Sequence, residues 1–210
     1  PTSFIQSTHN TVGAQIALML QCTGYNNTFV HRAFSFESAL LDSMMLLKEK
    51  QASFVLTGSA DELTRDSLEI LKRFDLFRKN GINSRDLLKS SERGSLPGEG
   101  TSFFLLTNED SPNSICTLDL VSTLYKPKTI DQIKTFIDGN LQSASISLKE
   151  IDLVITGRNG DEADDEIYNR IETDVFENIP VGYFKHLSGE YPTATSFALW
   201  LGANIVQQGM

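Results

Sequence analysis

Two stretches of this sequence have helical spacing but almost no polar face. Residues 34–50 and 192–207 each follow a short predicted strand, and each places apolar or small residues around most of the helix. The apolar residues of the first stretch are Phe36, Ala39, Leu40, Leu41, Met44, Met45, Leu46 and Leu47. A helix that is apolar on every side is a buried helix. The sequence therefore predicts two buried central helices between two sheets, a layered α-β-α-β-α arrangement within the α/β class.

The remaining pattern alternates between short apolar runs and helical stretches. We expect strands at residues 27–31, 53–57, 101–106, 114–121, 151–156 and 181–184. Further helices are expected at residues 11–21 with Asn10 as N-cap, 61–77, 130–141 with Thr129 as N-cap, and 161–178. Residues 78–99 are expected to form a polar loop. Strand–helix alternation indicates a mainly parallel sheet with right-handed crossovers.

Composition excludes several classes of protein. The 27 acidic and 18 basic residues give a net charge of −9, which argues against a nucleic-acid ligand. No run of about 18 apolar residues is present to span a membrane, and the first residues lack the pattern of a signal peptide. Two cysteines, Cys22 and Cys116, are too few for a disulfide framework, so we expect a cytoplasmic protein in which both are buried structural thiols.

Four segments together resemble the β-ketoacyl synthases of the thiolase-like fold. Residues 53–62 resemble that family's strand ending in a Gly-Gly-Ala-Glu/Asp turn, and residues 97–106 resemble its Gly-Glu-Gly segment before an apolar strand. Residues 185–189 (Lys-His-Leu-Ser-Gly) resemble its Lys-Ser-x-x-Gly-His motif, and residues 1–30 resemble the stretch before its nucleophile. The closest likeness is to chain-length-factor-like and ketosynthase-like proteins of bacterial aryl-polyene and flexirubin-type gene clusters.

The resemblance covers almost the whole sequence, yet a whole family member is about twice as long. It implies a chain truncated at both ends, with residues 1–125 as a partial N-terminal half and residues 126–210 as a partial C-terminal half. It also implies a place in fatty acid or polyketide biosynthesis, with acyl carrier protein as a partner and no cofactor.

The family's three catalytic residues are all replaced here. The resemblance places the nucleophilic cysteine at Ala33 and the two histidines at Arg158 and Glu190. Alanine offers no nucleophile, and a carboxylate donates a hydrogen bond only when it is protonated. We therefore expect a catalytically silent, chain-length-factor-like transferase homologue, although the sequence leaves open whether the chain is an enzyme.

An alternative keeps an acyltransferase or condensing activity with a relocated nucleophile. Ser35 would act with His31 or His186 as base, although Ser35 also suits helix capping. His31 and Arg32 either line a pocket or satisfy carbonyl groups at the helix entrance. His186 is expected to support a neighbouring residue or to be solvated, and not to act in catalysis. The resemblance implies a substrate-binding set of His31, Arg32, Phe34 and Lys185. A third interpretation is an acyl-binding or carrier-protein-binding module.

The same resemblance implies a dimer. Family members pair through the strand before the nucleophile, which gives an interface of Leu18, Asn27, Thr28, Phe29 and Val30. The mate would be an active ketosynthase or a second copy of this chain. The acidic run at residues 161–166 suits the positive end of a helix as a solvated face, so we expect no metal site.

Overall fold

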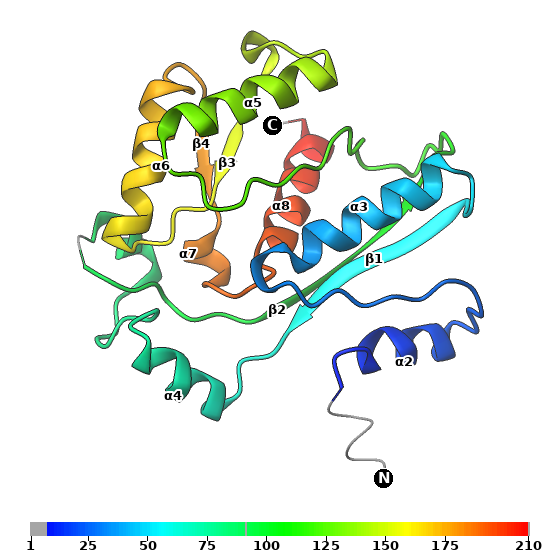
Figure 1. Cartoon of the computed structure of the whole chain (residues 1–210), viewed down its shortest axis with the longest axis horizontal. Helices are drawn as coiled ribbons and strands as arrows, with labels where there is room; N and C mark the ends of the chain where they lie inside the picture. Colours follow the sequence, from blue (N-terminus) through cyan, green and yellow to red (C-terminus); the bar gives the residue numbers. More distant parts are fainter. Residues whose placement is uncertain (1–7, 91, 210) are drawn as a thin grey trace.

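The structure, a computed structural model, describes residues 8–90 and 92–209 (Figure 1). Its α-helices are α2 (Thr11–Met19), α3 (Ser35–Lys48), α4 (Arg65–Arg73), α5 (Ile130–Ala144), α6 (Glu162–Asp174), α7 (Lys185–Ser188) and α8 (Thr195–Gln208). The 3-10 helices are η1 (Arg32–Phe34), η2 (Ser84–Lys89) and η3 (Leu148–Glu150). The strands are β1 (Phe54–Asp61), β2 (Gly100–Thr107), β3 (Val154–Thr156) and β4 (Val181–Tyr183). The first seven residues, in which a signal peptide was not expected, lie outside the described residues.

The strands form two separate sheets of two strands each. β1 and β2 are antiparallel over eight pairs, from Phe54 opposite Thr107 to Asp61 opposite Gly100. β3 and β4 are parallel over three pairs. The expectation of a mainly parallel sheet is therefore wrong for the first pair. The long connection between β1 and β2 contains only the short helices α4 and η2, and so long a connection lets the second strand return in either direction.

Two expected strands are not strands among the described residues. Residues 27–31 and 114–121 belong to no strand and form no strand pair in the part of the chain that the structure describes. A β-strand needs hydrogen bonds to the backbone of a neighbouring strand, and the sequence pattern does not show whether that neighbour is present. β1, in contrast, continues through Gly58, which was expected to end it. A Cβ at Gly58 would lie 2.4 Å from the Phe103 ring, so glycine there serves close packing.

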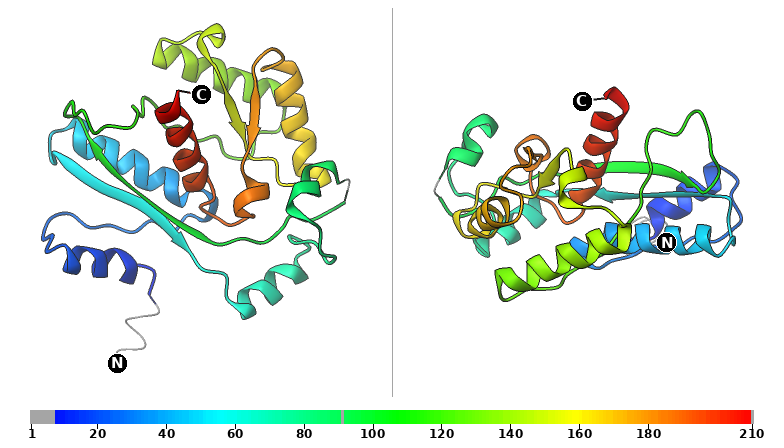
Figure 2. Two further views of the ribbon diagram at one scale, coloured as in Figure 1. Left: turned by 180° about the vertical axis from the view of Figure 1, so that it is seen from behind. Right: turned by 90° about the horizontal axis from the view of Figure 1, so that it is seen from above.

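The two helices that were expected to be buried, α3 and α8, both pack against the β1–β2 sheet region. Phe36 of α3 is 2% exposed, and its ring centroid lies 5.8 Å from that of Phe104 in β2. Ser196 of α8 is fully buried and accepts a 2.7 Å hydrogen bond from the Ser59 hydroxyl. Figure 2 shows α3 running along one side of the β1–β2 pair. Both helices also keep exposed apolar residues: Met45 on α3, and Trp200 and Val206 on α8.

Side-chain N-caps begin α4, α5 and α6, whereas α2, α3, α7 and α8 start without one. Thr129 caps α5 as expected, because its hydroxyl accepts from the Gln132 amide. Asn10 precedes α2 as expected but makes no side-chain cap bond. The acidic start of α6 corrects the expectation of a solvated face, because Asp161 and Asp165 are buried. Both accept backbone amide hydrogen bonds, which is the usual condition for burying a carboxylate.

Two of the motif segments meet at a close backbone contact. A Cβ on Gly98 would lie 2.2 Å from the Ser188 carbonyl oxygen, and Gly189 has a φ of +76° and faces Gly98. The amide of Gly98 donates to the carbonyl oxygen of Glu190 at 3.0 Å. A Cβ added at Gly100 would lie 2.6 Å from the Tyr191 hydroxyl. The glycines of these segments are therefore required by packing between them.

Both cysteines are exposed, which corrects the expectation that Cys22 and Cys116 are buried. Cys22 precedes, and Cys116 lies within, a segment that was expected to be a strand and has no strand partner in the described part of the chain. Among the described residues, no helix has the length and apolar character needed to cross a membrane.

Candidate functional site

The start of α3 carries the expected nucleophile position. Ala33 lies in η1, directly before α3, and is exposed. Its neighbour Arg32 has a φ of +54°, in the left-handed region that non-glycine residues rarely adopt. Such backbone conformations are concentrated at functional and ligand-binding sites. The backbone thus turns sharply just before α3, although Ala33 at this turn has no reactive group.

The polar side chains at this entrance are engaged in local hydrogen bonds. The Ser35 hydroxyl accepts from the His31 amide and donates to the Arg32 carbonyl oxygen, both at 2.8 Å. The Ser38 hydroxyl donates to the Phe34 carbonyl oxygen at 2.7 Å, and His31 Nδ1 lies 3.3 Å from the same hydroxyl. The imidazole therefore faces Ser38, while Ser35 serves the backbone at the helix start.

Phe34 extends this entrance toward a groove beside α5. Its ring packs edge-on against Tyr125, with centroids 6.1 Å apart. Tyr125 lines the groove together with Lys126 and Lys128. Four more of its lining residues come from the first two turns of α5: Asp131, Gln132, Thr135 and Phe136.

The two expected histidine positions lie beyond the carboxyl ends of β3 and β4. Parallel strands of an α/β sheet commonly place their functional groups at this end. Arg158 follows β3 and lies 3.5 Å from carboxylate oxygens of both Asp165 and Glu172. Its guanidinium also stands over the Tyr183 ring, 5.3 Å from the centroid. Burial lowers the pKa of Arg158, but Tyr183 and the two carboxylates outweigh it and raise the pKa.

Glu190 is held by two donors. Lys185 Nζ lies 2.7 Å and Asn159 Nδ2 2.9 Å from Glu190 Oε2. The side chains of Lys185 and Glu190 are 15% and 26% exposed, so the pair is largely shielded from water. The carboxylate of Glu190 thus already accepts hydrogen bonds from a cation and an amide within the protein.

Asp165 and Asn159 join these two positions into one network. Asp165 binds the amides of Asn159 and Gly160 at 2.9 and 3.1 Å and also pairs with Arg158. Asn159 in turn donates to Glu190. We call Arg158, Asn159, Asp165, Glu172, Lys185 and Glu190 the ionic network. The structure thus brings together Arg158, Lys185 and Glu190, three of the residues that the sequence pointed to.

Burial also affects a tyrosine beside this network. The hydroxyl of Tyr168 would lie 2.6 Å from a Cβ added at Gly157, the residue between β3 and Arg158. Desolvation raises the pKa of Tyr168, and Lys185 partly opposes that rise. Tyr168 therefore places its hydroxyl beside Gly157, next to the ionic network.

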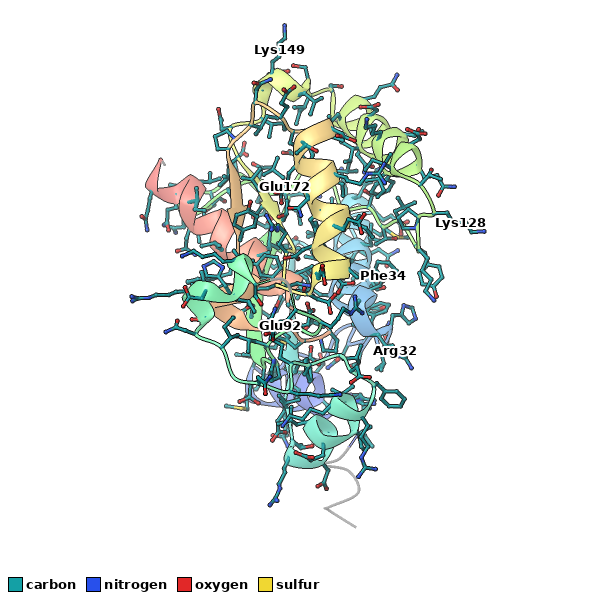
Figure 3. All side chains as sticks on the ribbon, turned by 90° about the vertical axis from the view of Figure 1, so that its left-hand side faces the viewer. Arg32, Phe34, Glu92, Lys128, Lys149 and Glu172 are labelled. Atoms are coloured by element: carbon teal, nitrogen blue, oxygen red, sulfur yellow. The ribbon has the colours of Figure 1, made fainter. Side chains whose placement is uncertain are left out.

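Arg78 supports the same loop and was missed by the sequence reasoning. Its side chain is 2% exposed, and it donates to the carbonyl oxygens of Gly94 and Gly160 and to the Ser90 hydroxyl. Glu92, labelled in Figure 3, lies 3.5 Å away as its exposed ion partner. Apart from its position next to apolar Phe77, nothing in the local sequence distinguishes Arg78 from a solvated arginine.

The entrance of α3 and the ionic network are separate in this structure. Among the described residues, no hydrogen bond or ion pair joins His31, Arg32 or Ser35 to Arg158, Lys185 or Glu190. His186 lies in α7, and its Nδ1 is buried without a hydrogen-bond partner. No group of three or more His, Cys, Asp or Glu residues in the described part of the chain is arranged to hold a metal ion.

Three of the five expected interface residues are exposed. Leu18 is 78% exposed, Val30 is 56% exposed, and α2 has no buried residue. Asn27 is also exposed, whereas Thr28 and Phe29 are half-buried. The pairing of residues 27–30 with a mate remains a prediction.

Solved structures with the same fold identify the architecture. No protein-family model matches the sequence, and no curated protein matches it. A chain of the complex "Ketosynthase (ApeO) in Complex with its Chain Length Factor (ApeC)" from Xenorhabdus doucetiae is similar over 98% of this chain and 52% of its own, with a TM-score of 0.78 and 19% identity. "The ishigamide ketosynthase/chain length factor" gives a TM-score of 0.73 and 19% identity over 96% of this chain and 53% of its own.

A third structure extends the comparison to a complex with a carrier protein. "AntDE:AntF (apo): type II PKS acyl-carrier protein in complex with its ketosynthase bound to the hexaketide" gives a TM-score of 0.73 and 15% identity over 94% of this chain and 54% of its own. The chain thus spans about half the length of the structures that it matches. These likenesses confirm the expected fold class: the 210 residues have a ketosynthase-like, thiolase-type fold, and they form about half of it.

Proposed function

We propose that this chain is part of a catalytically silent, chain-length-factor-like subunit of a β-ketoacyl-(acyl carrier protein) synthase. It would pair with an active ketosynthase in the cytoplasm and take part in fatty acid or polyketide (polyene) biosynthesis. Acyl carrier protein would be the partner that presents the growing chain. The observation that carries this proposal is the ionic network, in which Arg158 and Glu190 are bound to other protein groups where the family uses histidines.

Each of the three positions lacks the chemistry that condensation needs. Ala33 has no group that could form a thioester. Arg158 remains a cation at any ordinary pH and is paired with two carboxylates. Glu190 accepts hydrogen bonds from Lys185 and Asn159, so it does not stabilise a developing enolate oxygen. A substrate would have to break this network before either residue could take part in a reaction.

The comparisons support the assembly part of the proposal. Two of the similar structures are ketosynthase complexes, one with a chain length factor and one with an acyl carrier protein. The exposed apolar residues of α2 and the unpaired segment 27–30 provide the surface for such a mate. The division at residue 125 is also part of the proposal. It is supported by the two sheets, because β1 and β2 precede that residue and β3 and β4 follow it.

The rival proposal, a relocated nucleophile at Ser35, has less support. The Ser35 hydroxyl makes two backbone hydrogen bonds at the helix entrance, and the nearest imidazole, His31, faces Ser38. A serine nucleophile needs a base within hydrogen-bond reach of its hydroxyl. This arrangement favours a capping role for Ser35.

Reconstitution distinguishes the two proposals. The purified protein would be assayed for condensation of acyl and malonyl carrier-protein substrates, alone and with an active Cys-His-His ketosynthase. We expect no turnover alone, turnover in the mixture, and the same turnover with Ser35→Ala. Turnover by the protein alone that Ser35→Ala abolishes would establish the rival. A protein that binds no ketosynthase and carries out no turnover would contradict the subunit proposal.

A further inference from the structure

The buried guanidinium of Arg78 joins two loops that lie far apart in the sequence. Its Nε donates to the Gly94 carbonyl oxygen at 2.8 Å, one terminal nitrogen donates to the Ser90 hydroxyl at 2.6 Å, and the other donates to the Gly160 carbonyl oxygen. The side chain is 2% exposed, and its ion partner Glu92 is exposed and 3.5 Å away. A buried cation is stable only while its hydrogen-bond acceptors stay in place, so the guanidinium couples the positions of both loops.

Two further contacts join the same loops. Leu87 of η2 is fully buried, and a Cβ added at Gly160 would lie 2.6 Å from its side chain. Gly160 also has a φ of +81°, so this close approach depends on glycine for its backbone conformation as well as for space. In the opposite direction, the Asp161 carboxylate accepts from the Gly94 amide and, at 2.8 Å, from the Arg93 guanidinium. We call this set of contacting residues the latch: Arg78, Leu87, Gly94, Gly160 and Asp161.

The latch is directly connected to the ionic network. Gly160 follows Asn159 in the chain, and the amides of both residues donate to Asp165, at 3.1 and 2.9 Å. The side chain of Asn159 also donates to Glu190 at 2.9 Å. Because Arg78 holds the carbonyl oxygen of Gly160, it acts on the network through the backbone of the loop and contacts neither Asn159 nor Glu190 by a printed hydrogen bond of its own side chain.

We propose that Arg78 is a positioning residue for the loop at residues 157–161, and that the latch opens and closes as one local unit while both sheets stay folded. Within η2, Leu87 is the buried residue, and the other latch contacts are polar. Segments held by few buried apolar contacts open at a lower free energy than the core of a fold. In the open form, Glu190 would keep Lys185 as a donor and lose Asn159. The latch does not depend on the catalytic silence proposed above.

Amide hydrogen exchange, measured residue by residue at increasing urea concentrations below the unfolding transition, tests this proposal. In the wild-type protein, the amides of Gly94, Asn159 and Gly160 should share one opening free energy. They should be less protected than the paired amides of β1 and β2 by about tenfold or more, and their exchange should depend less on urea. Arg78→Lys replaces a forked guanidinium by one ammonium, which does not serve acceptors on both loops. This variant should speed exchange of the three amides by a common factor of about ten or more.

Arg85→Lys is the matched control, because it makes the same change at an exposed arginine of η2 and should leave the exchange of the three amides unchanged. Protection and urea dependence equal to those of the β1–β2 amides would show that the latch opens only when the whole fold unfolds, and would overturn the proposal. An effect of Arg78→Lys on Gly94 alone would also overturn it, since the two loops would then open separately. If Arg78→Lys does not fold, Leu87→Ala removes the other contact with Gly160 and should speed exchange of the same three amides together.

Discussion

At the residue scale, Glu190 acts as one partner of a shielded ion pair. Its carboxylate accepts from Lys185 at 2.7 Å and from Asn159 at 2.9 Å, and the lysine side chain is 15% exposed. Removing one member of such a pair leaves the other charge poorly solvated, which costs more than the pair itself contributes.

Glu190→Ala should therefore lower the free energy of unfolding by about 1–3 kcal/mol. Glu69→Ala is a matched control, because Glu69 pairs with Lys72 on the exposed surface of α4 at 3.7 Å. That variant should change stability by less than about 0.5 kcal/mol. Urea denaturation measures both values, and equal effects would show that the ionic network contributes no more than a surface pair.

The carboxyl group of Asp161 leads us to predict that the stability of the fold depends on pH. Burial raises the pKa of this carboxyl, but four groups outweigh it and lower the pKa below its ordinary value: the amides of Gly94, Asp164 and Ala163, and the Arg93 guanidinium. A carboxyl with a lowered pKa in the folded state stabilises the fold above its unfolded pKa, and that stability is lost as pH falls through the folded pKa.

We therefore expect stability to fall below about pH 4, where an unfolded aspartate begins to protonate. Asp161→Asn should be less stable at pH 7 and should lose less further stability between about pH 4 and 2. Asp131→Asn, in the exposed first turn of α5, should leave the acid dependence unchanged. Thermal unfolding across this pH range tests the prediction, and identical slopes for Asp161→Asn and the wild-type protein would contradict it.

At the scale of elements, the contact between Gly98 and Gly189 holds the start of β2 against the segment that follows α7. The clashes that a Cβ on Gly98 would make are with backbone atoms of Ser188 and Gly189, at 2.2 and 2.7 Å. Backbone atoms cannot move aside as the end of a flexible side chain can, so the two segments would have to separate.

Gly98→Ala should accordingly destabilise the protein by more than about 2 kcal/mol. Gly139→Ala provides the opposite control, because a Cβ there meets nothing within 4 Å and the residue lies inside α5. It should stabilise the protein by about 0.5–1 kcal/mol through helix propensity. Chemical denaturation of both variants would reveal the difference in sign, and a neutral Gly98→Ala would contradict the packing argument.

At the scale of the whole molecule, exposed apolar surface is the dominant feature. It includes α2, parts of α3 and α8, and four side chains of the β1–β2 pair: Phe54, Leu56, Phe103 and Leu105. The segment 27–30 leaves backbone groups available for a neighbouring strand, which is a liability for a protein that stays alone.

We predict a dimer joined by strand pairing at Phe29, preferably with an active ketosynthase and otherwise with a second copy. Phe29→Pro removes the backbone donor and should produce monomers, whereas Phe29→Ala keeps the donor and should weaken pairing less. Sedimentation velocity reports the assembly state. A stable wild-type monomer that does not aggregate and binds no ketosynthase would rule the dimer out.

The sequence by itself determined the local features of this protein. The apolar all-round pattern placed α3 and α8, Thr129 marked the start of α5, and the four motif segments indicated the fold that the solved structures share. These features depend on propensity, spacing and capping, which act within a few residues of each other.

Only the tertiary structure decided how distant residues meet. It made β1 and β2 antiparallel, left residues 27–31 and 114–121 without a strand partner among residues 8–90 and 92–209, and exposed both cysteines. It also buried Arg78 and joined Arg158 to Glu190 through Asp165 and Asn159. Strand direction, burial of a charge and ion pairing all depend on partners far away in the sequence. Their energies arise only when the chain has folded and water has been excluded between them.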